Sequence, residues 1–202
     1  MKKRNILLTF IFVVTISISS FAQGGGIWNF NWDIGFPVGE TSDFIGKASL
    51  RGFAIEGRGY VSDRLLVGGR FAWNTFYENE GWVTNTLEDY PTATIHGYSR
   101  NYMNVIPLML TGHFEFGYGA VLPYVGIGVG TYYIESRDYL GIYYVENNNW
   151  HFGVYPEIGA VIPFGSGSTA FNINAKYNYA AKTKDVNAQS WISLGVGLSY
   201  IF

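Results

Sequence analysis

The chain has 202 residues, no cysteine and a formal net charge of −2. Without cysteine it can form neither a disulfide framework nor a thiolate metal site. Charged residues make up 14% of the chain and aromatic residues 18%, whereas an average soluble domain has about 25% charged residues. Because acidic residues outnumber basic ones, 15 against 13, we expect no nucleic acid partner.

The first 22 residues have the three parts of an export signal. A basic start at residues 2–4 precedes an apolar run at residues 6–19, and a small-x-small motif ends at Ala22. The apolar run is too short for a comfortable transmembrane helix and resembles the core of a secretory signal. We therefore predict a cleavable signal peptide at 1–22, followed by a single domain at 23–202.

After residue 22, apolar residues alternate with small or polar ones, a period of two that indicates β-strands. In the last segment one face consists of Ile192, Leu194, Val196, Leu198, Tyr200 and Phe202, and the other of Ser193, Gly195, Gly197 and Ser199. The same signal predicts eight strands, at roughly 28–36, 50–61, 65–77, 98–116, 121–135, 150–164, 171–179 and 190–202.

The connections between these strands alternate in length. Long connections are expected at 37–49, 78–97, 136–149 and 180–189, and short ones at 62–64, 117–120 and 165–168. Short turns on one side and long loops on the other are typical of an antiparallel up-and-down membrane barrel. We therefore predict an all-β, eight-stranded transmembrane β-barrel in the outer membrane, with both mature termini in the periplasm.

A soluble lipocalin-like barrel, apolar inside and polar outside, would show the same alternation. Side-chain size favours the membrane barrel, because the less apolar face is small, as at Gly126, Gly128 and Gly130, and an eight-stranded barrel has a narrow interior. Pro107, Pro123 and Pro156 fall inside expected strands. Since proline removes a donor from the hydrogen-bond ladder, we expect bulges or strand ends at these positions.

The signal peptide, the eight amphipathic strands and the final Tyr200-Ile201-Phe202 together resemble the small outer-membrane β-barrel proteins of Gram-negative bacteria, the OmpX- and OmpW-like group. The segments 37–43 and 123–130 also look like recurring features of these barrels. The resemblance implies that Val196, Leu198, Tyr200 and Phe202 form the signal read by the barrel-assembly machinery. Because this family is functionally mixed, the resemblance predicts location and architecture only.

If the smaller face is luminal, six charged residues point into the barrel: Asp33, Glu56, Arg58, Arg70, Glu157 and Lys176. Buried charges are too costly to leave unpaired, so three acids and three bases predict a closed ion-pair network. This network is a structural plug in one interpretation and a gated path for small solutes in the other.

The sequence offers weak candidates for catalysis or metal binding. His113 shares a strand face with Glu115, and His151 shares one with Glu157, but neither pair has a recognisable third partner. The segment 96–99 holds a histidine and a serine without the spacing of a lipid A deacylase. The glycines at 126, 128 and 130 are better explained as a strand face than as a nucleotide motif. We therefore expect no catalytic residue, metal or cofactor.

The long loops at 78–97 and 136–149 mix acidic and aromatic residues, a composition that can bind an extracellular ligand. The favoured hypothesis is a monomeric, non-enzymatic barrel, in contact with the lipid bilayer, with a structural or surface-interaction role. A narrow passage for small hydrophobic or ionic solutes is the second hypothesis, and a lipid A-modifying enzyme is the third.

Overall fold

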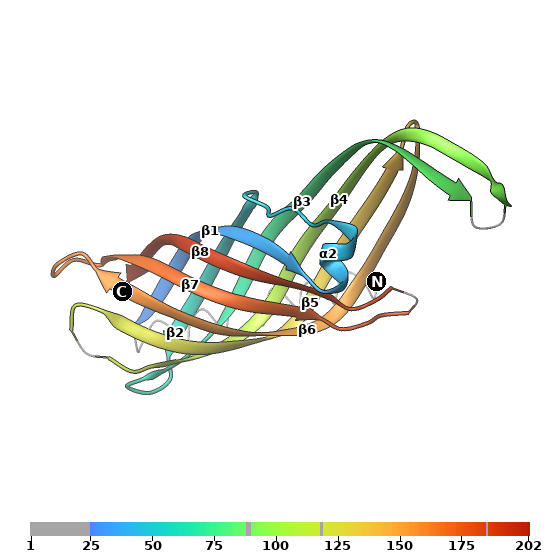
Figure 1. Ribbon diagram of the computed structural model, residues 1–202. Helices are drawn as coiled ribbons and strands as arrows, with labels where there is room; N and C mark the ends of the chain where they lie inside the picture. Colours follow the sequence, from blue (N-terminus) through green and yellow to red (C-terminus); the bar gives the residue numbers. More distant parts are fainter. Residues whose placement is uncertain (1–24, 88–89, 118, 185) are drawn as a thin grey trace, which may run out of the picture.

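Figure 1 shows the computed structural model, which describes residues 25–87, 90–117, 119–184 and 186–202. The predicted signal peptide at 1–22 lies outside the described residues. Within them, eight strands form one closed antiparallel barrel, in which each strand pairs with its neighbours in sequence and β1 pairs with β8. The predicted all-β, up-and-down barrel is confirmed.

The strands are β1 (Gly26–Val38), β2 (Gly52–Tyr60), β3 (Leu65–Leu87), β4 (Tyr90–Glu115), β5 (Leu122–Leu140), β6 (Tyr143–Pro163), β7 (Thr169–Ala180) and β8 (Gln189–Ile201). A short helix, α2 (Glu40–Phe44), lies in the connection between β1 and β2. Among the residues that the structure describes, no helix is long and apolar enough to cross a membrane.

The outer face of the barrel is apolar. Val125, Ile127 and Val129 point outward in the middle of β5, and the exposed rings of Trp28 and Trp150 lie on the same outer surface. A soluble barrel would bury these side chains, so the lipocalin-like alternative is wrong. The pattern is that of a barrel that faces lipid and carries aromatic residues toward its ends.

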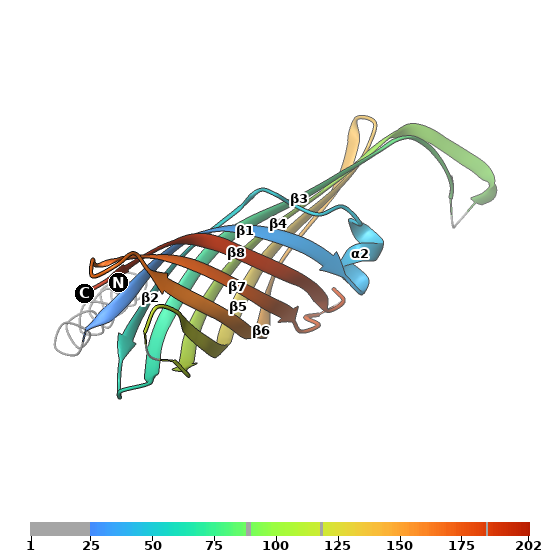
Figure 2. The same ribbon diagram turned by 60° about the vertical axis from the view of Figure 1, so that its left-hand side comes forward.

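The prediction that segments 78–97 and 136–149 are long loops is wrong, because both are largely β-strand. β3 and β4 stay paired as far as Leu87 and Tyr90, and β5 and β6 stay paired as far as Leu140 and Tyr143. Figures 1 and 2 show both hairpins extending past the rim, at the end of the barrel where α2 lies. Outside the membrane the outer face of a strand does not contact lipid and need not be apolar. The alternation of apolar and polar residues therefore weakens there, although strand pairing continues.

The prolines in mid-strand interrupt the ladder without a bulge. Opposite Pro107 the pairing of β3 with β4 stops at Phe71 and resumes at Asn74 in the same register. Opposite Pro156 the pairing of β6 with β7 shows the same gap, whereas Pro123 lies one residue inside the start of β5. Pro107 and Pro156 therefore each remove hydrogen bonds to one neighbouring strand and leave the barrel closed.

Several side chains inside the barrel are larger than predicted. Toward the α2 end the barrel is filled by an aromatic plug, which consists of Ile45, Phe76, Met103, Val105, Met109, Tyr132, Ile134, Tyr155, Ala180 and Trp191. Glycines make room for its rings: a methyl group on Gly128 would overlap the Tyr155 ring. The alternation of small and large inward residues fills a narrow barrel.

Candidate functional site

The middle of the lumen holds a cluster of buried charges on β1, β2, β3, β6 and β7. All six predicted luminal residues, Asp33, Glu56, Arg58, Arg70, Glu157 and Lys176, are buried there. We call these six residues, together with His113, the central charge network. Strand register places its members, since Glu56 lies directly opposite Arg70 and Glu157 directly opposite Lys176, and directly opposite residues share a face.

Arg58 is the hub of this network. Its Nη2 donates to Glu56 Oε2 at 3.0 Å and to Glu157 Oε1 at 3.2 Å. The guanidinium carbon also lies 4.4 Å from the centre of the Tyr124 ring, and the Tyr124 hydroxyl donates to Glu157 Oε1 at 2.8 Å. One arginine thus links two carboxylates from opposite walls of the lumen.

The other two bases each have a carboxylate partner. Arg70 donates to Asp33, and its Nη1 lies 3.8 Å from Glu56 Oε2. Lys176 Nζ lies 3.5 Å from Glu157 Oε1 and also donates to Asn174. Three acids and three bases therefore balance, which is the arrangement in which buried charges cost least.

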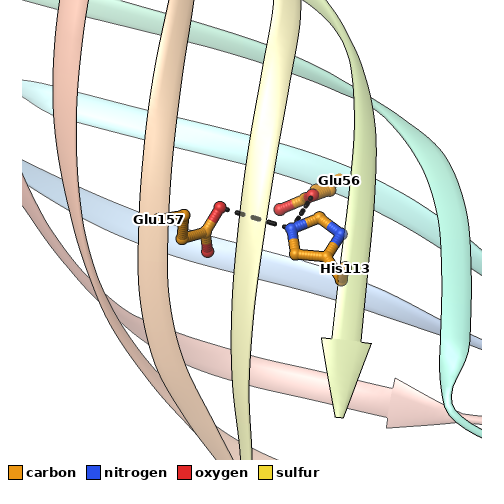
Figure 3. A group of neighbouring side chains, drawn as sticks. All are labelled: Glu56, His113 and Glu157. Carbon is orange, nitrogen blue, oxygen red and sulfur yellow. Dashed lines mark hydrogen bonds and ion pairs between the residues drawn. The ribbon is translucent and has the colours of Figure 1, made fainter.

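His113 is the last member of the network, and Figure 3 shows it between Glu56 and Glu157. Its Nε2 lies 3.4 Å from Glu56 Oε1 and 3.4 Å from Glu157 Oε2. The three ligand atoms lie within 4.8 Å of one another, a spacing that a metal ion could bridge. Arg58 already binds both carboxylates, however, so a divalent cation would add two positive charges to a balanced, buried set. The arrangement therefore fits an ion-pair network better than a metal site.

Sequence reasoning missed the contribution of His113 and Tyr124 to this network. Spacing along the strand groups His113 with Glu115, but Glu115 accepts a hydrogen bond from the Tyr60 hydroxyl at 3.0 Å instead. One signal could have placed Tyr124: it has the same parity as Gly126 and Gly128, and residues two apart along a strand share a face, which here is the luminal one.

The remaining catalytic candidates do not come together. Ser99 Oγ donates to Glu80 Oε2 at 3.0 Å, and His96 Nδ1 lies 2.8 Å from Thr84 Oγ1, so each has another partner. His151 Nδ1 lies 2.8 Å from the carbonyl oxygen of Ala181. Six residues along a strand span about 20 Å, which keeps His151 away from Glu157.

The residues of the predicted assembly signal lie on the closing strand. Leu198, Tyr200 and Phe202 point outward, and Val196 is half-buried on the same face. Phe202 also closes the barrel, because its amide donates to Gly26 O at 3.0 Å and its carbonyl accepts from Gly26 N at 2.9 Å.

Beyond the rim, the two hairpins form one four-stranded surface, which we call the projecting sheet: residues 75–87, 90–104, 135–140 and 143–148. Trp82 is 69% exposed on it and Tyr143 is 77% exposed. The pairing of β6 with β7 ends at Gly153, so residues 143–151 form an edge whose backbone groups are available to another chain.

Charge on the projecting sheet is mostly acidic. Among its described side chains are Glu78, Glu80, Glu135, Asp138 and Glu146, against Arg100 and Arg137. Partial burial and the nearby Glu80 carboxylate raise the pKa of Asp138 above its ordinary value. Aromatic rings pack between the charges, as where Trp82 stacks on His96 with ring centres 5.2 Å apart. The sheet thus presents rings and carboxylates together.

Three solved structures share this architecture at low sequence identity. Neisserial surface protein A matches with a TM-score of 0.53 and 13% identity, over 89% of this chain and 98% of that one. The outer membrane protein OprG from Pseudomonas aeruginosa gives 0.52 and 13%, over 89% and 96%. The N-terminal β-barrel domain of Pseudomonas aeruginosa OprF gives 0.50 and 12%, over 89% and 100%.

The fold and the lipid-facing surface define the class of this protein: a membrane-spanning, eight-stranded β-barrel of the outer-membrane type. The resemblance to the small outer-membrane barrels of Gram-negative bacteria, inferred from the sequence, is confirmed at the level of the fold. No known protein family and no curated protein matches the sequence. At sequence identities of 12–13%, the likeness to these structures establishes the fold of this chain but not its activity.

Proposed function

We propose that this chain is a non-enzymatic surface-interaction protein, in which the barrel anchors the projecting sheet outside the cell. One observation carries the proposal: the strands of both hairpins continue past the rim as one paired sheet, with exposed rings and a free edge on β6. Exposed aromatic groups and unpaired strand edges are the features that bind other macromolecules.

The filled lumen argues against the second candidate function, passage of solutes along the axis. On the α2 side, the aromatic plug closes the interior with edge-to-face contacts, such as that of Tyr132 with Trp191 at 5.2 Å between ring centres. Toward the other end, Tyr124 packs with Val161 and Ala170. The central charge network lies between these two apolar layers, so its balanced charges support a structural role.

The proposal includes the predicted topology and biogenesis. The signal peptide directs export, both mature termini lie in the periplasm, and the barrel acts as a monomer. The face of β8 that carries Val196, Leu198, Tyr200 and Phe202 serves as the assembly signal. Support for this topology is the length difference between the two ends of the barrel, since outer-membrane barrels have short periplasmic turns and long external segments.

A short-hairpin variant tests the proposed function. Asn79 lies opposite Arg100, and Arg137 lies opposite Glu146, so residues 80–99 and 138–145 can each be replaced by a two-residue Asn-Gly turn without a change of register. Cells that produce either chain are compared for attachment to immobilised extracellular-matrix proteins and to cells of the same strain. We expect the native chain to increase attachment and the short-hairpin variant to lose that increase.

The matched control keeps the sheet and alters the opposite end. Two glycines inserted after Ser166, in the turn between β6 and β7, should leave attachment unchanged. Equal attachment by the native and short-hairpin chains, with equal amounts of folded barrel, would contradict the proposal. Regular conductance steps from the native chain in a planar bilayer would instead favour the passage.

A further inference from the structure

A groove runs down the outer surface of the barrel where β2 stops short of its neighbours. β2 begins only at Gly52, whereas at the same end of the barrel β1 extends to Val38 and β3 to Leu87. Two adjoining hollows, of about 330 and 320 Å³, lie here and share Gly52 and Phe53. Both are shallow and open broadly onto the outer surface of the barrel, where a lipid molecule could lie along them.

The second hollow is lined mainly by apolar residues of the outer face. Phe30, Trp32 and Ile55 surround it, and all three are exposed on the outer face of the barrel. The Trp32 ring is fixed, because its Nε1–H donates to the carbonyl oxygen of Leu50 at 2.7 Å. An apolar groove that contains one fixed ring suits an acyl chain.

The upper hollow adds a positive charge to the same groove. Arg51 lies beside Phe53 and Trp73. It comes directly before β2 and is exposed, as Phe53 and Ile55 are on the outward face of that strand. Its backbone is held in place, since its N–H donates to Ser49 Oγ at 3.1 Å and its carbonyl accepts from Thr75 N at 2.9 Å.

Arg51 has no carboxylate partner among the described residues, and its guanidinium carbon lies 5.8 Å from the centre of the Tyr77 ring. The nearby Lys47 differs, because its Nζ lies 3.8 Å from Glu78 Oε1. An arginine on a lipid-facing surface is costly unless it reaches the interface and finds an anion. A phosphate group offers the two oxygens that a guanidinium binds best.

We propose that this groove binds a phosphorylated, multiply acylated lipid of the outer leaflet, with an acyl chain along Phe30, Trp32 and Ile55 and a phosphate on Arg51. The assignment of the leaflet rests on the proposed topology, in which the α2 end faces outward. The groove itself is independent of the projecting sheet, so binding of lipid and attachment of cells can fail separately.

Native mass spectrometry of the full mature chain in detergent micelles tests this site with two matched probes: diphosphorylated lipid A, and the same lipid with its phosphates removed. We expect the native chain to retain the phosphorylated probe at least about tenfold more strongly, as the loss of a charge-assisted hydrogen bond implies. Arg51→Gln should remove this preference. Arg51→Lys, which keeps the charge but loses the two-pronged geometry, should retain part of it.

Lys182→Gln is the matched control, because it removes one exposed positive charge from the connection between β7 and β8 at the same end of the barrel. It should leave the preference intact. Equal retention of the two probes by the native chain would overturn the assignment of a phosphate to Arg51, whatever the variants do. Equal loss of preference in Lys182→Gln would show attraction by general charge and would also overturn the site.

Discussion

At the scale of single residues, glycine sets how much the lumen can hold. Gly128 lies opposite Tyr155, and Gly153 faces the Tyr132 ring closely enough that a methyl group would overlap it. The rings of the aromatic plug therefore fit only because the facing residues on neighbouring strands are glycines. Close packing of this kind is sensitive to one added carbon.

Gly128→Ala should lower the free energy of unfolding by about 1–3 kcal/mol, because the added methyl group forces the Tyr155 ring to move within a filled interior. Urea titration of the barrel in lipid vesicles, followed by tryptophan fluorescence, measures the change. Gly112→Ala is the matched control, since nothing lies within 4 Å of its added carbon. Equal effects of the two substitutions would mean that the plug is loosely packed.

The central charge network is also a property of individual side chains. Arg58→Met leaves Glu56 and Glu157 without their shared donor, so we expect a loss of about 3–5 kcal/mol, the usual cost of removing one partner from a buried pair. Arg51→Met, on the outer surface, should change stability by less than about 0.5 kcal/mol. The same urea titration compares them. A loss below about 1 kcal/mol for Arg58→Met would show that water reaches the network.

At the scale of secondary-structure elements, the buried side chain of α2, Thr41, ties the helix to the start of β8. Thr41 Oγ1 donates to Gln189 Oε1 at 2.8 Å and accepts from the Ser190 amide at 2.8 Å. The neighbouring Ile45 belongs to the aromatic plug and Phe44 packs against it. The helix therefore joins the connection after β1 to the start of β8.

Thr41→Val keeps the shape of this side chain and removes both hydrogen bonds. We expect faster hydrogen exchange at the Ser190 amide and a loss of stability of about 1–3 kcal/mol, because a buried donor loses its acceptor. Ser42→Ala serves as the control, since Ser42 Oγ only donates to Gly39 O within the same turn, at 2.6 Å. Unchanged exchange at Ser190 would show that α2 is held by other contacts.

Strands that face lipid could be predicted from the sequence, and strands beyond the lipid could not. The alternation of Phe171, Ile173 and Ala175 with asparagines follows from one apolar and one luminal face, and it locates β7 well. In the projecting sheet both faces meet water, so the sequence of Trp82 and Val83 has no comparable constraint and resembles a loop. Pairing there depends on the partner strand, which a single segment does not encode.

The same distinction applies to the luminal residues. Parity along a strand places Glu56 and Arg70 inside, because each strand has only two faces. It cannot predict that His113 lies between Glu56 and Glu157, since that depends on the register of β4 and β5 with their neighbours. Function is still harder to predict from the sequence, because it depends on which molecules the sheet edge and the outer groove contact.

At the scale of the whole molecule, the lumen of the barrel is filled by side chains. The aromatic plug and the central charge network fill the lumen with buried side chains, so the native chain should give no regular conductance steps in a planar bilayer. Trp191→Ala combined with Phe76→Ala removes two contacting rings of the plug, whose centres are 6.1 Å apart, and should raise conductance only if water can then cross the central charge network. Regular steps from the native chain would contradict a closed lumen.

The orientation of the anchor decides which of its ends meets the outside world. Because the chain has no cysteine, a single introduced cysteine reports its own position without background. Asn147→Cys lies in the projecting sheet and Ser166→Cys in the opposite turn. A membrane-impermeant thiol reagent added to intact cells should label Asn147→Cys and leave Ser166→Cys unlabelled, whereas both should react once the outer membrane is permeabilised. Labelling of Ser166→Cys alone in intact cells would reverse the topology, place the projecting sheet in the periplasm and remove the basis for a role at the cell surface.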